Sequence, residues 1–547
     1  MSANSVNKIR LPFGDTNWYK VTRGVAQGAV ESPFLYSCFI NGLAENLRNK
    51  GFGVLVAGIL TPLLMYADDV VLLAASIEEL HLMNKVASHY AYTNRYQFNG
   101  KKSNVMCFYA KKVLLKQVQF EHWELFGEPV SVSNSYRYLG VTISVNLKDW
   151  DTYLGRAIGK ASRTSEELAW LCRQDTGLLP RSAATLWKAI VRPMLEYAAE
   201  LWSGEITKKM AKRAESVQTN FLRAILGVFG CQSIPDDFIR AELGMEKLSA
   251  RWEKLRLGYW RRLHTSAVGT TLNSLVHLRG EQVDGAKTVF NNGWMGKTKK
   301  LLLDRGLESV WNEPTSCTEM SKSTWKATVY EAVESFETIA TSDRLSKLKS
   351  SAAARFLRSK NWGKLSKEYA TSKSEAGRRG ALVIERYLDD RLEPVGRRLK
   401  LLCRAACLPL LKRIAREEKL PQTAGTCKMC CEGVIEDLEH FIFSCVAYTK
   451  SRAKLFETTQ LLPDSLPPED RLDIPLGRST DFEETDTLVD MAIKRFLKKA
   501  WRTQIWLVKE TNKALNRNDT PWAVKAHGDS VSPYFIVKSA PRRSSKY

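Results

Sequence analysis

Two adjacent aspartates, Asp68 and Asp69, interrupt a strongly apolar stretch, LLMYADDVVLLAAS. Apolar runs of this length, bounded by turn residues, predict two hairpin strands buried in a sheet, with the aspartates at the bend. A buried carboxylate is costly unless it is paired or bound to a metal ion. Carboxylates are the ligands that Mg²⁺ prefers, and two-metal phosphoryl transfer needs them in close pairs. The alternative is a plain polar turn between strands.

The stretches around the aspartates predict an α+β segment. In chain order we expect a strand Trp18–Thr22, a turn Gly24–Gly28, a helix Pro33–Lys50, strands Val54–Leu60, Leu63–Met65 and Val70–Ala75, a helix Ile77–Tyr96, a loop Phe98–Ser103, a strand Val105–Tyr109 and a strand pair within Tyr136–Ile143. Beyond Asp149 apolar residues recur at helical spacing, and Pro193 is expected to kink that region. An antiparallel sheet with helices, followed by a mainly α-helical region, is therefore the predicted fold.

Three further short motifs accompany the aspartate pair in a fixed order. GVAQGAVESP at Gly24–Pro33 precedes YADD, FNGKKS follows at Phe98, and YLGVTIS follows at Tyr138. In this order the residues resemble the reverse transcriptase family, most closely its non-LTR retrotransposon branch. The resemblance covers about residues 18–230. It implies a polymerase palm, which is the sheet-and-helix domain that carries the active site, and a helical thumb after it.

The resemblance also implies a role for each motif. Motif B lies against the incoming nucleotide and the template base, and it comprises Gly24, Gln27, Gly28, Ser32 and Pro33. Motif C holds the catalytic Mg²⁺ ions, and it comprises Tyr66, Ala67, Asp68 and Asp69. Motif D contains the lysine that assists the departing pyrophosphate, and it comprises Asn99, Lys102 and Ser103. Motif E is the primer grip, and it comprises Tyr138, Leu139 and Gly140.

One expected motif is missing from this pattern. In the family, an aspartate-bearing strand called motif A precedes motif B and supplies the third metal-binding carboxylate. Asp15 is the only aspartate before Gly24, and its surroundings, FGDTNWYKVTRG, look like the strand that leads into motif B. Two carboxylates should hold the metal ions poorly, so we expect this chain not to polymerise by itself. A truncated copy of an element, or a chain whose motif A and fingers come from an upstream polypeptide, both fit this pattern.

A second candidate metal site lies far along the chain. Cys427 and Cys430 are followed after nine residues by His440 and Cys445, a spacing that a tetrahedral Zn²⁺ accepts. Cys431 is an alternative ligand beside them. Core cysteines next to a buried histidine are the alternative interpretation. EDLEHFIFSCVAY after a CxxC pair resembles the zinc-binding segment near the carboxyl end of many such retrotransposon proteins, which implies a structural zinc knuckle with a role in nucleic-acid binding.

The charge of the chain indicates a polyanionic partner. The 82 Lys and Arg exceed the 59 Asp and Glu, which leaves a formal charge of +23. Residues 341–420 hold 21 Lys and Arg against 9 Asp and Glu, so this stretch is a candidate phosphate-contacting face, with solvated basic helices as the alternative. Trp362 and Tyr369 within it are expected to pack in a core rather than to stack on bases. No apolar run is long enough to predict a membrane span or a secretion signal.

The composition and length predict several domains rather than one. The expected division is a partial palm at 1–149, a thumb-like helical region at 150–270, a basic helical linker region at 271–420, a zinc-knuckle segment at 421–460, a linker with a final helix at 461–512 and a disordered tail at 513–547. Linker-like composition occurs around 280–298, 372–380 and 461–480, and the final helix is expected at about Asp486–Thr511.

Two functions from different classes fit the sequence. The first is RNA-directed DNA synthesis on an RNA template from a DNA primer and dNTPs, in the nucleus, by an enzyme that needs Mg²⁺ and structural Zn²⁺. The second is a remnant that binds RNA or DNA through its basic helices and zinc knuckle without chemistry. A group II intron maturase shares YADD but does not explain the carboxyl-terminal cysteines. Nucleic-acid binding is common to the first two, whereas only the first predicts primer extension.

Overall fold

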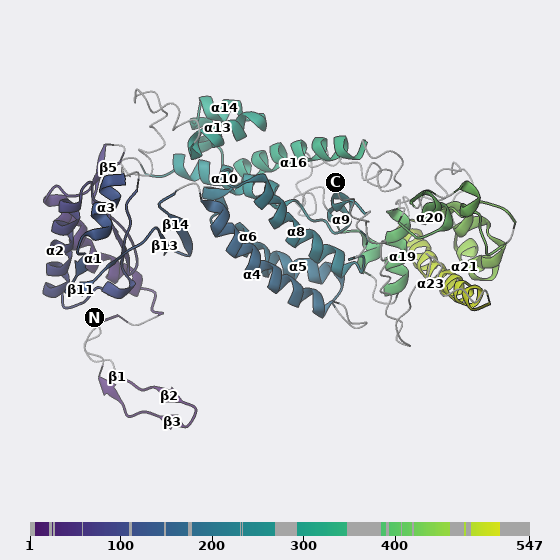
Figure 1. The fold of residues 1–547 in the computed structure, drawn as a ribbon, viewed down its shortest axis with the longest axis horizontal. Helices are drawn as coiled ribbons and strands as arrows, with labels where there is room; N and C mark the ends of the chain where they lie inside the picture. The colour runs from purple at the N-terminus through teal and green to yellow at the C-terminus, as the bar shows by residue number, and fades with distance from the viewer. Residues whose placement is uncertain are drawn as a thin grey trace, which may run out of the picture. The chain divides into compact units, whose positions relative to one another are not determined.

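The computed structural model describes part of the chain, in two compact units (Figure 1). The described residues are 6–20, 24–25, 28–56, 58–108, 112–146, 149–172, 178–229, 231, 234–267, 293–346, 384–389, 393–405, 407–417, 419, 421–430, 432–459, 475–476 and 483–514. The first unit comprises Met1–Tyr153, Tyr259–Lys300 and Asn312–Glu319. The second unit comprises Leu154–Gly258, Leu301–Trp311 and Met320–Tyr547.

The described strands lie in the first unit and pair two by two. The antiparallel pairs are β1 (Val6–Asn7) with β4 (Tyr19–Lys20), β2 (Arg10–Leu11) with β3 (Gly14–Asp15), β5 (Val54–Val56) with β6 (Ile59–Thr61), β7 (Leu63–Tyr66) with β8 (Asp69–Leu72), β10 (Glu124–Leu125) with β11 (Glu128–Pro129), and β13 (Ser135–Tyr138) with β14 (Val141–Ser144). One pair is parallel, β9 (Asn104–Val105) with β12 (Ser131–Val132). Small sheets with helices confirm the α+β class at this coarse level.

Two helices, α1 (Ser32–Asn49) and α2 (Ile77–Thr93), form the core of the first unit, as predicted. Proline in the first turn favours the start of α1, because its missing N–H would have no partner there. The side chain of Ser76 caps α2 by accepting a hydrogen bond from the Glu79 N–H at 3.1 Å. The buried side chains of the core recur at helical spacing, and they are Ile40, Leu43, Ala44, Leu47, Met83 and Ala87, with Leu63 from β7.

Some predicted elements of the first unit are wrong in detail. The strand expected at Val105–Tyr109 is short, because β9 ends at Val105, no strand follows through residue 108, and residue 109 lies outside the described residues. The loop expected at Phe98–Ser103 contains a 3₁₀ turn, η1 (Gly100–Lys102), because the Asn99 side chain accepts from the Lys102 N–H. Short stretches such as these are controlled by local side-chain hydrogen bonds, which apolar periodicity does not register.

Beyond Asp149 the described residues are helical, as expected. One further helix, α3 (Lys112–Phe120), precedes that point. The α-helices after it are α4 (Trp150–Leu171), α5 (Pro180–Ile190), α6 (Arg192–Glu196), α7 (Ala199–Trp202), α8 (Lys208–Ile225), α9 (Asp236–Glu242), α10 (Leu248–His264), α13 (Trp294–Asp304), α14 (Glu308–Asn312), α15 (Thr315–Glu319), α16 (Lys322–Ser346), α19 (Pro394–Arg404), α20 (Leu411–Glu417), α21 (Thr449–Thr459) and α23 (Glu483–Ala514). The shorter helical turns are η2 (Arg386–Asp389), η3 (Gln422–Gly425), η4 (His440–Ser444) and η5 (Val446–Tyr448). Among the described helices, none has the length and apolar character needed to cross a membrane.

The sequence placed several boundaries of the helical region correctly. The chain breaks near Pro193, since α5 ends at Ile190 and α6 begins at Arg192. The final helix is confirmed, although α23 is longer than predicted at both ends. The linker expected around 280–298 is wrong at its end, because α13 begins at Trp294. Residues 372–380, most of 461–480 and the predicted disordered tail lie outside the described residues.

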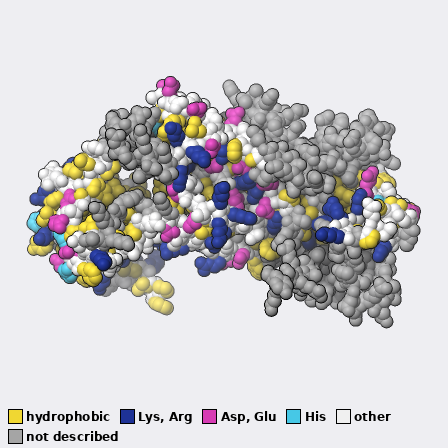
Figure 2. All heavy atoms as spheres, turned by 45° about the horizontal axis from the view of Figure 1, so that its top comes forward, with side chains coloured by type: hydrophobic (Ala, Val, Ile, Leu, Met, Phe, Trp, Pro, Cys, Tyr) yellow, Lys and Arg dark blue, Asp and Glu magenta, His cyan; other side chains and the backbone are white. Residues whose placement is uncertain are grey.

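Much of the basic stretch 341–420 also lies outside the described residues. Two of its described cations, Lys400 and Arg404, are each 2% exposed and pair with acidic side chains of the second unit. They therefore take no part in a phosphate-contacting surface, and the rest of that prediction stays untested, Trp362 and Tyr369 included. Over the face drawn in Figure 2, Lys and Arg side chains alternate with acidic ones.

A buried ion pair joins distant segments of the second unit. Glu242, at the end of α9, is fully buried and accepts hydrogen bonds from the Arg404 guanidinium at 2.7 and 3.2 Å. The Tyr387 hydroxyl donates to the same carboxylate at 2.5 Å, and Arg404 also donates to the Leu476 carbonyl at 2.6 Å. A buried pair of this kind is stable only while both partners are present, because either charge alone would be uncompensated.

Replacing Glu242 with Gln should destabilise the second unit by about 3–5 kcal/mol, because it leaves the buried Arg404 charge with only the longer ion pair to Glu385, at 3.5 Å. The measurement is the urea midpoint of the unfolding transition. Glu166→Gln on α4 is the matched control, since Glu166 is exposed and its replacement should change stability by less than about 0.5 kcal/mol. Equal midpoints for the two variants would contradict the role given to this pair.

Candidate active site and metal centre

The aspartate pair lies at the tip of the β7–β8 hairpin. The strands pair from Leu63↔Leu72 to Tyr66↔Asp69, so Ala67 and Asp68 form a two-residue turn. Ala67 has φ +50°, a left-handed conformation that costs a residue with a side chain roughly 1–2 kcal/mol. A turn held in such a conformation fixes the backbone on both sides of it.

The expectation that this bend is buried is wrong. Asp68 and Asp69 are exposed, Tyr66 is 67% exposed, and Leu64 in the preceding strand is 48% exposed. The apolar runs suggested a strand covered on both faces, but β7 and β8 form a sheet of only two strands among the described residues. Of their residues only Leu63 is buried in the core, and Met65, Val70 and Leu72 are partly buried against it. The hairpin tip therefore presents its carboxylates to solvent.

Each aspartate lies near a tyrosine from a different motif. Burial raises the pKa of Tyr36 on α1, and the negative charge of Asp68 raises it further. Burial likewise raises the pKa of Tyr138 at the end of β13, and the charge of Asp69 adds to the effect. The first unit thus brings the helix that follows motif B, the motif C hairpin and the motif E strand to one place.

The motif B turn has the glycine conformations that its sequence predicts. Gly24 and Gly28 have φ +91° and +89°, which residues with a Cβ rarely adopt. Ser32 and Pro33 then begin α1, and the Ser32 N–H donates to the Ala29 carbonyl at 3.3 Å. Gln27 lies outside the described residues, so its predicted place against the incoming nucleotide and the template base stays a prediction.

Motif D contacts the strand that leads into motif E. The Tyr136 hydroxyl on β13 donates to the Lys102 carbonyl at 2.9 Å, which leaves the exposed Lys102 side chain free to reach outward. Leu139 and Gly140 form the turn to β14, with φ +47° and +79°. Local hydrogen bonds and turn geometry therefore hold these two motifs together without a continuous sheet.

No third carboxylate joins Asp68 and Asp69 among the described residues. Asp15 pairs instead with Lys8 in the β2–β3 hairpin. The described part of the chain contains one group of three or more close potential metal ligands, and it is the carboxyl-terminal cysteine and histidine cluster. The aspartate pair could contribute to a Mg²⁺ site, but it does not complete one.

The proximity of the aspartates to the two tyrosines yields a crossed prediction. Asp68→Asn should lower the pKa of Tyr36 and leave the pKa of Tyr138 unchanged, because it removes a negative charge that acts on Tyr36 only. Asp69→Asn should lower the pKa of Tyr138 and leave that of Tyr36. NMR titration of ¹³C-labelled tyrosine measures both groups, and each variant is the control for the other. Shifts on the same tyrosine in both variants would refute this geometry.

The carboxyl-terminal cluster brings all four predicted ligands together. One ligand atom from each of Cys427, Cys430, His440 and Cys445 lies within 4.8 Å of the others. The Cys427 and Cys445 sulfurs are 3.8 Å apart, and the Cys430 sulfur is 3.5 Å from His440 Nε2. A tetrahedral Zn²⁺ with ordinary bond lengths would place two ligand sulfurs about 3.8 Å apart, and a sulfur and an imidazole nitrogen about 3.6 Å apart. The donor set and its spacing therefore fit zinc, whereas Cys431 lies outside the described residues.

Short local structures position these ligands. The Cys427 N–H donates to the Val434 carbonyl at 2.6 Å, and a β-bridge joins Thr426 to Ile435, so the CxxC turn folds back on the chain. His440 begins the π-helical turn η4, and the Asp437 carboxylate caps its N–H at 2.9 Å. Burial raises the pKa of the Cys427 thiol to about 12, so a cation would have to displace its proton.

The sequence analysis missed two acidic residues that support the cluster. Asp437 caps the turn that carries His440, and Glu436 is 1% exposed with its carboxylate 3.9 Å from the Cys427 sulfur. Both occur in the segment VIEDLEH, where an acidic residue three positions before a histidine is a recognisable capping signal. No comparable local signal identifies Glu436, since its partners are distant in the sequence.

The doubly substituted chain Cys427→Ser/Cys430→Ser should lose bound zinc and unfold at a lower temperature, because two of four ligands are removed. Zinc released on denaturation, measured with a chromogenic chelator, and thermal unfolding followed by circular dichroism give the two readouts. Cys38→Ser is the control, since Cys38 is exposed and belongs to a different region. A folded wild-type chain that holds no zinc after purification with zinc would contradict the assignment.

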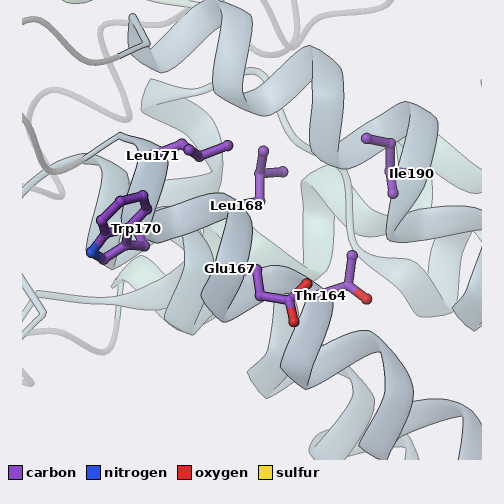
Figure 3. Close-up of a pocket in the computed structure, with 6 residues that line it drawn as sticks. All are labelled: Thr164, Glu167, Leu168, Trp170, Leu171 and Ile190. Atoms are coloured by element: carbon purple, nitrogen blue, oxygen red, sulfur yellow. The ribbon is translucent and has the colours of Figure 1, made fainter.

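A shallow apolar groove of about 520 Å³ lies between α4 and α5 (Figure 3). Its lining contains none of the residues singled out from the sequence, and it consists of Thr164, Glu167, Leu168, Trp170, Leu171 and Ile190. Trp170 is 59% exposed at its edge. Nothing in its chemistry indicates a phosphoryl-transfer site.

Comparison with known proteins identifies relatives of the chain. Residues 4–143 match the family described as reverse transcriptase (RNA-dependent DNA polymerase). The chain is 25% identical over 234 residues to the probable RNA-directed DNA polymerase from transposon X-element of Drosophila melanogaster, which covers 40% of this chain and 23% of the relative. It is 24% identical over 221 residues to the putative 115 kDa protein in type-1 retrotransposable element R1DM of the same organism, covering 39% of this chain and 20% of the relative.

A third relative gives the same result. The probable RNA-directed DNA polymerase from transposon BS of Drosophila melanogaster is 25% identical over 223 residues, covering 38% of this chain and 23% of the relative. The matched region of the chain thus spans about a fifth to a quarter of the length of these relatives. The matched residues 4–143 include those of motifs B, C, D and E. Residues 4–143 of the chain are thus similar to the reverse transcriptase family, and the relatives that it matches are proteins of retrotransposable elements.

Proposed function

We propose that this chain contributes part of the catalytic core of an RNA-directed DNA polymerase that copies a retrotransposon RNA. The observation that supports it most is the family match over residues 4–143, which contains the aspartate pair and its neighbouring motifs. RNA template, DNA primer and dNTPs are the substrates in this proposal. The primer would be nicked chromosomal DNA, which places the reaction in the nucleus.

In the proposed reaction a primer 3′-hydroxyl attacks the α-phosphate of a dNTP. Mg²⁺ held by Asp68 and Asp69 would neutralise the charge that develops on the phosphate oxygens. The backbone turn at Gly24 and Gly28 leaves room for a nucleotide to approach, since no described atom beyond the adjoining residues lies within 4 Å of where a Cβ would stand on either glycine. Gln27 and Tyr66 would contact the template base and the nucleotide.

The remaining motif residues would orient the reactants. Lys102 is exposed and carries a positive charge that could meet the departing pyrophosphate. Tyr138, Leu139 and Gly140 form a tight turn beside the aspartates, where a primer end would be gripped. The charge of Asp69 beside Tyr138 supports this placement of the primer grip next to the metal ligands.

None of the described residues adds a third carboxylate to Asp68 and Asp69, and we propose that a separate polypeptide supplies it. This chain would then bind nucleic acid but would not extend a primer alone. Helices of the 150–270 region would act as the thumb, residues 271–420 as a basic connection, and residues 421–460 as a zinc knuckle that contacts nucleic acid.

The alternative is a binding protein without chemistry, and the missing third carboxylate among the described residues favours it. Under this proposal the basic helices and the zinc knuckle would hold RNA or DNA, and Asp68 and Asp69 would be dispensable. The two proposals differ in what happens when the catalytic core is completed, and not in whether the chain binds.

The test combines binding and extension assays on an RNA template annealed to a DNA primer. The chain alone should bind, with an affinity that falls by about 10³-fold or more between 50 and 200 mM salt if six or more phosphates are contacted, and it should add no dNTP. Supplying the amino-terminal reverse transcriptase segment of a relative in trans should permit templated extension, which Asp68→Asn abolishes.

Three outcomes would decide against parts of this proposal. Extension by the chain alone, lost in Asp68→Asn, would overturn the incomplete site. Absence of salt-dependent binding would overturn the nucleic-acid role. Extension in trans that is unaffected by Asp68→Asn would remove this aspartate from the catalytic core, and Glu166→Gln serves as the surface control throughout.

A further inference from the structure

Glu436 is a buried carboxylate beside the four candidate zinc ligands. It is 1% exposed, and its Oε1 lies 3.9 Å from the Cys427 sulfur. It does not belong to the group of potential metal ligands. The Cys427 thiol loses its proton when it binds a metal ion, so the link that persists then is the backbone one, in which the Glu436 N–H donates at 2.8 Å to the carbonyl of Gly425, two residues before Cys427.

Two helices donate hydrogen bonds to this carboxylate. The backbone N–H of Leu411, the first residue of α20, donates to Oε2 at 2.8 Å. The side-chain amide of Gln504 on α23 donates to Oε1 at 3.2 Å, across 68 residues of sequence. Gln504 is 8% exposed, so its amide would lose its partner in a dry environment if Glu436 were removed.

Apolar contacts continue this link between α23 and the cluster. The ring of Phe441 packs against the rings of Phe496 on α23 and of Tyr448. The distances between ring centroids are 5.9 Å and 5.1 Å, and Phe441 directly follows His440 in the chain. Phe441, Tyr448 and Phe496 are each at most 2% exposed. The side of the cluster that faces away from solvent is therefore built on α23.

We propose that Glu436 is a positioning residue that couples metal occupancy of the cluster to the docking of α20 and α23. The inference rests on the proposed zinc site. Zinc would fix Cys427 and the backbone next to it, the hydrogen bond from the Glu436 N–H to the Gly425 carbonyl would fix Glu436, and the Glu436 carboxylate would hold the start of α20 and the side chain of Gln504. Metal binding and helix docking would then stabilise each other.

Such coupling is reciprocal, which makes it testable from the far side. If zinc strengthens the docking of α23 through Glu436, then weakening the α23 side must weaken zinc binding by the same factor. Gln504→Met removes the donor while keeping a similar volume, and Gln504 touches none of the four ligands in the interactions described. A purely local metal site predicts no change in zinc affinity for this variant.

The experiment uses the full chain and Zn²⁺. Zinc affinity is measured by competition with a chromogenic chelator, and hydrogen exchange of α20 and α23 is measured before and after chelation. Glu436→Ala should lower zinc affinity about fivefold or more, because it removes the contacts by which α20 and α23 hold the segment next to Cys427. Gln504→Met should lower it about fivefold or more. In the wild-type chain, chelation should speed exchange in both helices.

Exposed neighbours provide the controls. Glu432→Ala removes a carboxylate from the same loop, and Arg502→Met changes an exposed side chain on the same turn of α23, so both should bind zinc as the wild type does. Unchanged zinc affinity in Gln504→Met, or chelation that leaves exchange in α23 unchanged, would overturn the coupling while the zinc site stands. A wild-type chain that binds no zinc would overturn both. If Glu436→Ala fails to fold, Gln504→Met still decides.

Discussion

The cost of removing a carboxylate from water determines how the second unit is assembled. Glu242 and Glu436 are both about 1% exposed or less, and each is compensated by donors from segments far away in the sequence. Such groups tolerate few arrangements, because a displaced donor leaves a charge or a polar group buried without a partner. Packing of apolar helices alone would allow many neighbouring arrangements, whereas these hydrogen bonds select one.

The same cost explains why the first unit differs from what its sequence suggested. An apolar hairpin with two aspartates reads as buried charge that awaits a metal ion. In the structure the hairpin tip meets solvent, so Asp68 and Asp69 are stable there without a cation. Motif order and hairpin register were predictable, since both depend on local patterns and on turn residues. The exposure of the hairpin tip was not predictable from the sequence. It depends on which segments pair with the free edges of β7 and β8, and the pattern of a single segment does not contain this information.

The cysteine and histidine cluster shows the opposite balance. Its four ligands were predictable because coordination imposes fixed sequence spacings, and the structure brings their donor atoms within 4.8 Å of one another. The residues that support it were only partly predictable. Asp437 carries a local capping signal, but Glu436 meets Gln504 across 68 residues, and no pattern within either segment announces that contact. Charge counting failed for the same reason at Arg404 and Lys400, which appear as surface cations in the sequence and are buried partners in the structure.

Helix α23 places these buried groups in one continuous arrangement. Towards its carboxyl end, Gln504 donates to Glu436 beside the cysteine and histidine cluster. Nearer its amino end, Asp490 accepts from Lys400 of α19 at 2.5 Å. Helix α19 ends at Arg404, which pairs with Glu242. Every contact in this series lies inside the second unit, and none involves Asp68 or Asp69. A metal ion at the cluster would therefore act on the stability of this unit, and the phosphoryl-transfer chemistry proposed for the aspartates would have its own metal ions and its own pH and salt dependence. Defects in the two sites should thus be separable by experiment, since removal of a metal ion from the cluster would change folding of the second unit, whereas substitution of an exposed aspartate would not.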